Sequence, residues 1–353
     1  MSWDNKKGKC FYSYYIMFIH PTREGKALVS TCSNNFFRYE NRVIVDADIS
    51  AAWNAPQFRF QRSLLLKGSW QACWGAECAY RPTTFDDHYI ADPEVKEHIR
   101  SGKTRLAYLP KALYLVPTMV CNQSCYYCYC FRGKRHKHCR TAQLREGLLR
   151  EIEEILIPAA DIVVLSGGEP FFSEVGVKLI RHIIEKYPRK KLYVFTNGVF
   201  LDAFGLETIM AHNFLLRVSL PGMSELSYMQ VTGTRNYGRV RANIESLLRS
   251  GFQGMELTFV LSKESFREID DFCRFVELNP GIRHALVEPN YFESRRFHRH
   301  MSEYEKRYGH LSARIDFDYR NKDLSGRVLR ALYNPLHTIA FRSWSLREEK
   351  GTG

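Results

Sequence analysis

Apolar residues between positions 113 and 290 follow a repeating order in which short continuous runs alternate with residues spaced three and four apart. The continuous runs predict strands buried on both faces, at residues 113–116, 162–165, 191–195, 215–220, 255–261 and 285–287. The three-and-four spacing predicts helices between them, near residues 141–156, 175–187, 206–211, 240–250 and 266–276. The first helix is expected to start at a cap on Thr141 and to stop before Pro158. Six strands that alternate with helices in this way predict an α/β fold with a parallel sheet.

Two architectures satisfy this alternation, because parallel strands with right-handed crossovers form either a doubly wound sheet or a full or partial barrel. Hydrophobic spacing alone does not distinguish them. The flanking segments do not show this alternation of strands and helices. Residues 1–112 are aromatic-rich, with strand-like stretches at 11–19 and 42–45 and a helix-like stretch at 93–100, and predict a small α+β accessory domain. Residues 291–353 are basic and predict an extension that wraps the βα domain.

Composition and charge narrow the class of protein. Of the 353 residues, 45% are hydrophobic and 25% are charged, which are ordinary globular proportions and argue against a disordered chain. No apolar run approaches the roughly 18 residues of a membrane span, and the apolar N-terminal stretch lacks a small-residue cleavage site. A cytoplasmic protein without a membrane segment is therefore expected. Lys and Arg exceed Asp and Glu by 51 − 38 = 13, which favours anionic partners without identifying them.

Half of the ten cysteines fall within one short segment, at positions 121, 125, 128, 130 and 139. Such a cluster in a chain without an export signal is typical of a cofactor site in a reducing compartment. Cys121, Cys125 and Cys128 directly follow the first predicted strand in a C-x3-C-x2-C spacing. Thiolates are the ligands of iron–sulfur clusters. Three of them leave one iron of a four-iron cluster open to a substrate or cofactor.

Two other interpretations of these three cysteines remain open. Their i, i+4, i+7 spacing also suits structural cysteines on one helix face, although the polar residues 122–124 and Pro117 do not resemble a core helix. A zinc site is the second, although tetrahedral zinc favours paired C-x2-C knuckles and this loop holds one pair. A non-catalytic iron–sulfur or zinc-binding protein is thus the alternative from a different functional class.

The order of the motifs resembles the radical S-adenosylmethionine (SAM) superfamily, whose signature is a C-x3-C-x2-C loop after the first strand. Ser-Gly-Gly-Glu-Pro at residues 166–170 ends the second strand, as the family's GGEP-type motif does. Thr-Asn-Gly at 196–198 ends the third, and Ser-Leu-Pro-Gly at 219–222 ends the fourth. Pro221 stands where many relatives carry aspartate, which leaves the contact of that carboxylate in doubt. The resemblance covers residues 113–290.

This resemblance implies a partial (β/α)6 barrel of the TIM type. It implies that Cys121, Cys125 and Cys128 bind a [4Fe–4S] cluster and that SAM chelates the open iron. Reductive cleavage of SAM then gives a 5′-deoxyadenosyl radical, which abstracts hydrogen from a substrate. The resemblance supplies no hydrogen donor or other catalytic side chain, so none is assigned.

Positions that match the family's motifs are expected to contact SAM: Tyr127, Gly167, Gly168, Glu169, Thr196, Asn197, Ser219 and Arg235. Tyr127 matches an aromatic residue beside the adenine, and the glycine pair would let the backbone approach the methionine amino group. Arg235 is a candidate clamp on the methionine carboxylate. A solvated surface arginine is an equally good interpretation of that residue.

Cysteines outside the signature loop suggest an auxiliary site. Cys32, Cys73 and Cys78 lie in the N-terminal segment, which faintly resembles the SPASM or twitch-type modules of some family members. Most cysteines of such a module are missing, so a degenerate module with ordinary buried cysteines is favoured over an auxiliary cluster. The basic residues 132–137 predict a solvated loop that attracts an anionic substrate or an acidic flavodoxin or ferredoxin.

The favoured substrate is a ribosomally synthesised peptide, because relatives with auxiliary modules often modify peptides. A nucleotide, a sugar or another small molecule is the alternative among enzymes. Nucleic acid is disfavoured as a partner, because the basic stretch at 295–300 lacks regularly spaced stacking aromatics.

Overall fold

The computed structural model describes residues 12–32, 42–67, 92–128, 141–290 and 294–317. Its strands form one ten-stranded sheet in the order β10-β9-β8-β7-β6-β5-β4-β1-β2-β3. The strands are β1 (Ile16–Pro21), β2 (Ala27–Ser30), β3 (Arg42–Val45), β4 (Ala112–Leu115), β5 (Ile162–Leu165), β6 (Lys191–Thr196), β7 (Phe214–Ser219), β8 (Met255–Leu261), β9 (Ile282–Pro289) and β10 (Ile315–Phe317).

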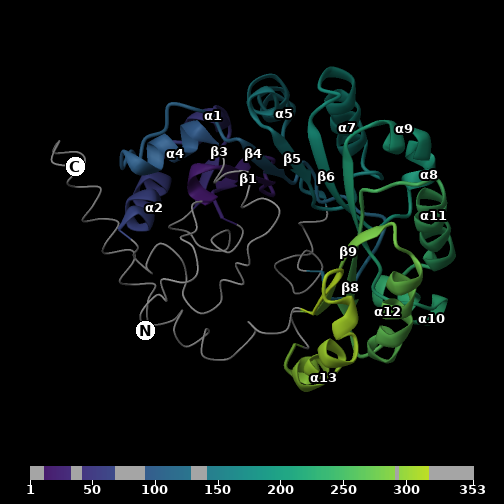
Figure 1. Cartoon of the computed structure of the whole chain (residues 1–353). Helices are drawn as coiled ribbons and strands as arrows, with labels where there is room; N and C mark the ends of the chain where they lie inside the picture. Colours follow the sequence, from purple (N-terminus) through teal and green to yellow (C-terminus); the bar gives the residue numbers. More distant parts are fainter. Residues whose placement is uncertain (1–11, 33–41, 68–91, 129–140, 291–293, 318–353) are drawn as a thin grey trace.

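The arrangement of strands β4 to β9 decides between the two predicted architectures. Each of them pairs in parallel with the next strand along the chain. A doubly wound sheet would reverse its strand order at a switch point, and this sheet does not. The prediction of a partial (β/α)6 barrel is confirmed. Figure 1 shows the strands curving as an arch, with helices on its outer side.

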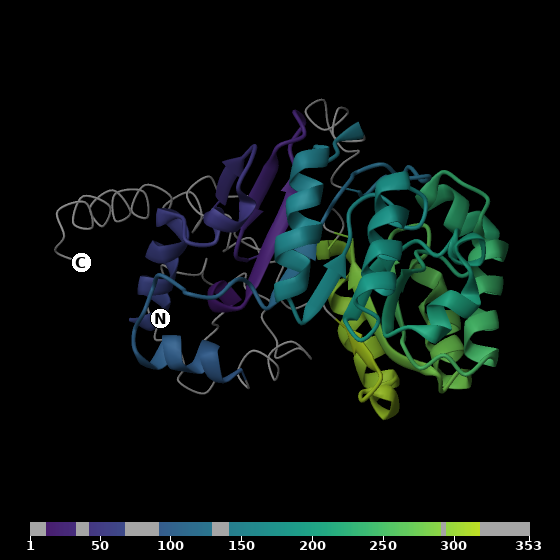
Figure 2. The ribbon, with the colours of Figure 1, turned by 90° about the horizontal axis from the view of Figure 1, so that it is seen from above.

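The helices follow the predicted alternation. Figure 2 shows them lying along the outside of the sheet. They are α1 (Ile49–Ala52), α2 (Pro56–Leu66), α4 (Pro93–Arg100), α5 (Glu146–Glu151), α6 (Ile157–Ala159), α7 (Glu174–Lys186), α8 (Leu201–Phe204), α9 (Leu206–Ala211), α10 (Glu225–Thr232), α11 (Tyr237–Arg249), α12 (Ile269–Leu278) and α13 (Ser294–Arg307). Within the described residues, none of these helices is both long and apolar enough to cross a membrane.

The predicted start of the first barrel helix is wrong. Thr141 caps no helix, because Gln143 forms an isolated bridge with Thr118 and the Leu144 N–H donates to the Pro117 carbonyl at 2.9 Å. These tertiary bonds keep the chain extended, and α5 begins only at Glu146. It continues through a π-helical turn into α6, around Pro158, which has no N–H to donate.

Both flanking segments extend the sheet of the barrel. Strand β1 pairs in parallel with β4 and antiparallel with β2, and β10 pairs in parallel with β9 at the other edge. The predicted elements at β3 and α4 are found at their expected residues. The predicted boundary between an N-terminal accessory domain and the barrel, at residue 112, stays a prediction. Cys73, Cys78, Cys130 and Cys139 lie outside the described residues, and Cys32 is partly buried.

The two faces of the sheet differ in character. On the outer face, Val218 of β7 lies toward Val240 of α11, since a Cβ added at Gly198 would meet both side chains. Alternate residues along β7 therefore point to the opposite face, which we call the inner face. The β7 burial pattern alternates between buried outer-face residues and partly exposed inner-face residues. The apolar outer face packs the helices, and the inner face is free to carry polar groups.

His20 supplies a test of the packing between β1 and β4. Its ring stacks on Tyr114 with 6.1 Å between centroids, and burial lowers the pKa of His20 to about 3. Below the unfolded-state pKa of about 6.5, the unfolded chain binds a proton that the folded chain does not. The free energy of unfolding therefore decreases as the pH is lowered, by up to ~1.4 kcal/mol per pH unit. His20→Phe is expected to remove this acid sensitivity between pH 7.5 and 5.5 in urea unfolding. The exposed control His310→Gln should retain it, and an unchanged pH profile in His20→Phe would contradict this assignment.

Candidate active site

Four loops gather at one edge of the sheet. They follow β4, β5, β6 and β7 and contain, in that order, the C-x3-C-x2-C segment and residues 166–170, 196–198 and 219–222. The carboxyl ends of parallel strands share one edge, which is where active sites of barrels form. The structure therefore brings the four predicted motifs together.

The cysteine loop is attached to the end of helix α10. The Ser124 N–H donates to the Thr232 carbonyl at 2.9 Å, and the Tyr126 N–H donates to the Val231 carbonyl at 3.1 Å. Below them, the buried amide of Gln123 donates to the hydroxyl of Tyr228 at 2.6 Å. An irregular loop thus takes its shape from hydrogen bonds to a helix more than 100 residues later in the chain.

The donor set of this loop fits an iron–sulfur cluster. Cys121, Cys125 and Cys128 are partly buried, and burial raises the pKa of Cys121 to about 11 and that of Cys125 to about 12. Among the described residues, no three His, Cys, Asp or Glu side chains gather closely enough to share one metal ion. Thiolates are the ligands that iron–sulfur clusters take, so the chemistry of these three donors fits such a cluster.

Glu169 connects the loop after β5 to the loop after β6. Its side chain is buried and accepts from the Thr196 hydroxyl at 2.7 Å, the Asn197 N–H at 2.6 Å and the Phe171 N–H at 3.1 Å. Burial raises the pKa of Glu169 to about 7, against the lowering effect of these three donors. Its carboxylate therefore faces the Thr196 loop, where it fixes the position of Thr196 and Asn197.

The glycine pair before Glu169 lies against the backbone that leads to the cysteines. A Cβ at Gly168 would lie 2.0 Å from the Val120 carbonyl oxygen, and one at Gly167 would lie 2.6 Å from that of Thr118. Gly167 also has a φ of 122°, which side chains rarely adopt. The Gly168 N–H donates to the Thr118 carbonyl at 3.0 Å. The two glycines thus allow two site loops to pair through their backbones.

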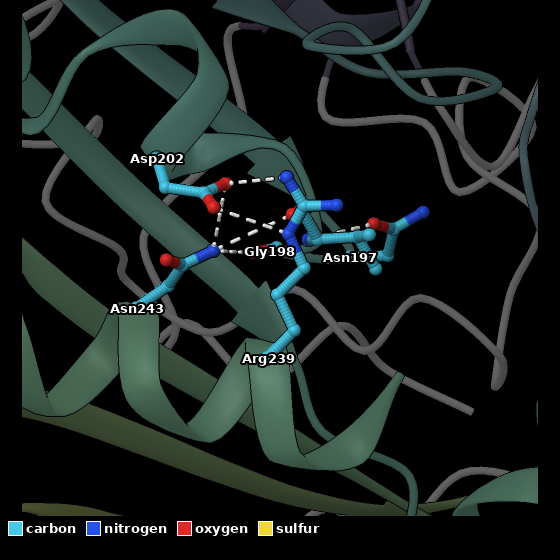
Figure 3. Close-up of polar contacts among 6 residues, drawn as sticks. Asn197, Gly198, Asp202, Arg239 and Asn243 are labelled. Carbon is cyan, nitrogen blue, oxygen red and sulfur yellow. Dashed lines mark hydrogen bonds and ion pairs between the residues drawn. The ribbon is translucent and has the colours of Figure 1, made fainter. Parts of the chain in front are cut away.

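Asn243 holds the loop after β6 from the helix side (Figure 3). Its amide donates to the Gly198 carbonyl at 2.9 Å and approaches the Asp202 carboxylate at 3.4 Å. Asp202 in turn forms a two-pronged ion pair with Arg239. The sequence analysis assigned no role to Asn243. A buried asparagine within the apolar stripe of α11 is the signal that indicates an anchoring role.

The three remaining residues predicted to contact SAM are Ser219, Tyr127 and Arg235, and they lie in different environments. Ser219 ends β7 on the inner face, facing the same edge as the other loops. Tyr127 packs edge-on against Tyr126 with 5.9 Å between centroids. Arg235 is exposed between α10 and α11, which suits the solvated interpretation and leaves its role as a clamp a prediction.

The loop that carries Pro221 is held by a different carboxylate. Glu268 accepts from the Met223 N–H at 2.7 Å, the Ser224 hydroxyl at 2.6 Å and the Ser227 hydroxyl at 2.5 Å. Ser224 also caps α10. The order of this loop therefore does not require the aspartate that many relatives carry at the Pro221 position.

A polar network on the inner face was not predicted from the sequence. Arg217 donates to one carboxylate oxygen of Glu256 through Nε at 3.1 Å and Nη2 at 2.7 Å, and the Tyr193 hydroxyl donates to the same oxygen. The guanidinium lies over the rings of Tyr193 and Phe195, at 5.6 and 5.5 Å from their centroids. Charged residues at alternate positions of apolar strands were the available signal.

Aromatic rings continue this network across the inner face toward the N-terminal strands. Phe195 lies 6.1 Å from Tyr114 between ring centroids, and Tyr114 stacks on Phe18 at 5.0 Å. The inner face thus has an aromatic half on β1, β4 and β6 and a polar half that begins at β7. This surface lies directly below Ser219 and the other loops at the strand ends.

Comparisons with known proteins agree with this geometry. Residues 115–276 match the model of the Radical SAM superfamily. The "Probable GTP 3',8-cyclase" of Sulfurisphaera tokodaii is 26% identical over 164 residues, which cover 45% of this chain and 49% of that protein. The "GTP 3',8-cyclase" of Petrotoga mobilis is 23% identical over 185 residues, covering 49% and 57%. The chain therefore spans about half the length of these curated relatives.

Among solved structures, the chain is similar to the crystal structure of Streptococcus suis SuiB bound to precursor peptide SuiA. The TM-score is 0.47 at 16% sequence identity, and the match covers 85% of this chain and 72% of SuiB.

Glu169→Gln tests the connection between the site loops. A glutamine amide would direct a donor at the Thr196 hydroxyl or the Asn197 N–H, leaving a buried donor without an acceptor. We expect a loss of about 3 kcal/mol in the free energy of unfolding, measured with urea on the cluster-free protein. Glu154→Gln, at an exposed position, should cost little. Equal stability of the two variants would show that the Glu169 bonds contribute nothing.

Proposed function

Since the chain belongs to the radical SAM superfamily of enzymes through residues 115–276, we propose that it modifies a ribosomally synthesised peptide by hydrogen abstraction. The family's cofactors are a [4Fe–4S] cluster and SAM. The observation that carries the proposal is the joining of three motif loops at one sheet edge, through Glu169 and its bonds to Thr196 and Asn197.

The chain's own residues would hold and orient these groups. Cys121, Cys125 and Cys128 would hold the cluster on a loop whose shape α10 maintains. When bound, the cluster supplies one electron and SAM supplies the 5′-deoxyadenosyl radical that removes a substrate hydrogen. The Gly167–Gly168 backbone and Ser219 would line the SAM site at the strand ends. The inner face below them would receive the substrate and exclude water from the reaction.

The charges on the inner face favour a peptide over a nucleoside triphosphate. Its described ionisable side chains on β7 to β10, apart from His284, are one arginine and three acids: Arg217, Glu256, Glu288 and Asp316. Lys191 and Arg283 lie at the opposite, amino ends of their strands. Phosphates near the acids would be repelled, whereas a neutral or cationic peptide group would not.

A nucleotide is the second candidate substrate. The relatives named GTP 3',8-cyclase favour it, although they match this chain over about half of their length. An acidic flavodoxin or ferredoxin is our proposed electron donor, because the whole chain has a formal net charge of +13. A cytoplasmic, reducing location would keep the cysteines available for the cluster.

Reductive cleavage of SAM tests the enzyme proposal. We expect the anaerobically reconstituted protein to release 5′-deoxyadenosine when reduced with dithionite, as measured by liquid chromatography. Cys125→Ala should abolish the product, because it removes one of the three iron ligands, while Cys273→Ala, at a buried core position, should retain it. Formation of S-adenosylhomocysteine instead would indicate methyl transfer. Absence of both products would reject the proposal.

The substrate class is tested by stimulation of the same reaction. A mixed library of short peptides is expected to raise the rate of 5′-deoxyadenosine formation, and GTP is not, because of the acidic inner face. Glu256→Gln should weaken the peptide effect by disturbing the Arg217–Tyr193 network, while the control Glu245→Gln, on the outer helix α11, should not. Stimulation by GTP alone would shift the proposal to a nucleotide.

A further inference from the structure

The side chain of Asn197 reaches the first cysteine of the signature loop. Its amide nitrogen Nδ2 donates to the Asn122 side-chain oxygen at 2.7 Å and lies 3.9 Å from the Cys121 sulfur. Its backbone N–H donates to Glu169. Asn197 therefore connects the loop after β6 with both the cysteine loop and the loop after β5.

The orientation of this amide is determined by its other end. The Val199 N–H donates to the Asn197 side-chain oxygen at 3.1 Å, and only an oxygen can accept that bond. An amide flip would place the NH2 group against this N–H and the oxygen against the Asn122 oxygen. Nδ2 must therefore face Cys121. Since Asn197 is only 9% exposed, water competes little for its N–H groups.

We propose that Asn197 is a positioning residue that donates an N–H to the Cys121 sulfur and thereby raises the reduction potential of the cluster held there. The inference rests on the proposed function, since it requires a cluster on Cys121. A thiolate bound to iron carries more charge than a thiol, so it accepts a stronger hydrogen bond. Hydrogen bonds to cluster sulfurs are a known determinant of cluster potential.

A second N–H approaches the same sulfur from within the cysteine loop. The Gln123 N–H lies 3.4 Å from the Cys121 sulfur and is part of the backbone. Asn197 is thus the side-chain donor to this sulfur that mutation can remove. This role adds to, and is separable from, the predicted contact of Asn197 with SAM.

Potentiometric titration of the reconstituted cluster, followed by electron paramagnetic resonance without SAM, tests the inference. Without SAM, a lost SAM contact cannot change the potential. We expect Asn197→Ala and Asn197→Ser to shift the potential to more negative values, since neither side chain can bring an N–H to the sulfur. The matched control Asn122→Ala removes the other partner of Nδ2, an oxygen that also lies 4.0 Å from the Cys121 sulfur, and leaves the N–H donor in place, so its potential should not become more negative.

The outcomes separate this inference from the proposed function. A wild-type protein that holds no four-iron cluster would overturn the proposed function itself. A wild-type potential in both Asn197 variants would overturn the tuning role and leave the cluster assignment intact. An equal shift in Asn122→Ala would also overturn it, by showing that loop position alone sets the potential. Loss of iron from both Asn197 variants, with Asn122→Ala loaded, would assign Asn197 to holding the loop and overturn tuning.

Discussion

The buried carboxylate of Glu169 is the interaction on which the proposed site depends. It has three hydrogen-bond donors, and two of them come from the next strand's loop. A buried carboxylate is costly unless it is hydrogen-bonded, so its ionised form requires Thr196 and Asn197 to stay within reach. Asn197 also contacts the cysteine loop, so the Glu169 carboxylate helps to fix the position of the first cysteine through Asn197. Three loops from separate strands are thus joined by one hydrogen-bond network.

The outer face of the sheet is apolar and the inner face carries polar groups, so polar chemistry is possible on the inner face. The outer face packs apolar side chains under the helices, and any polar group there would need a partner of its own, as Asn243 has. The inner face carries Arg217, Glu256 and Tyr193 as a bonded network. A partly buried ion pair of this kind is weak evidence for stability, because desolvation offsets its attraction. Its place beneath the loops of the proposed site is the reason that we propose contact with a substrate.

Much of the fold follows from local sequence, since continuous apolar runs bounded by turn residues predict all six barrel strands. The site loops were also predictable, because motif residues directly follow strands whose ends share an edge. Thr141 shows the limit: a local capping signal was overridden by tertiary bonds to Thr118 and Pro117. The Arg217–Glu256 pair could not be predicted, because 39 residues separate its members and only strand register brings them opposite. The sequence shows Asn243 within an apolar helix stripe, but only the structure identifies the loop that it anchors.

The cysteine loop has no regular structure of its own, and its contacts come from later parts of the chain. Helix α10 holds its backbone, Tyr228 holds Gln123, and Asn197 holds Asn122. The three thiols can therefore take their relative positions only after the chain has folded through α10. Burial raises the pKa values of the Cys121 and Cys125 thiols. A cluster held there, as we propose, would bind to a loop that the rest of the fold already positions, so it would stabilise the whole barrel edge rather than the cysteine segment alone.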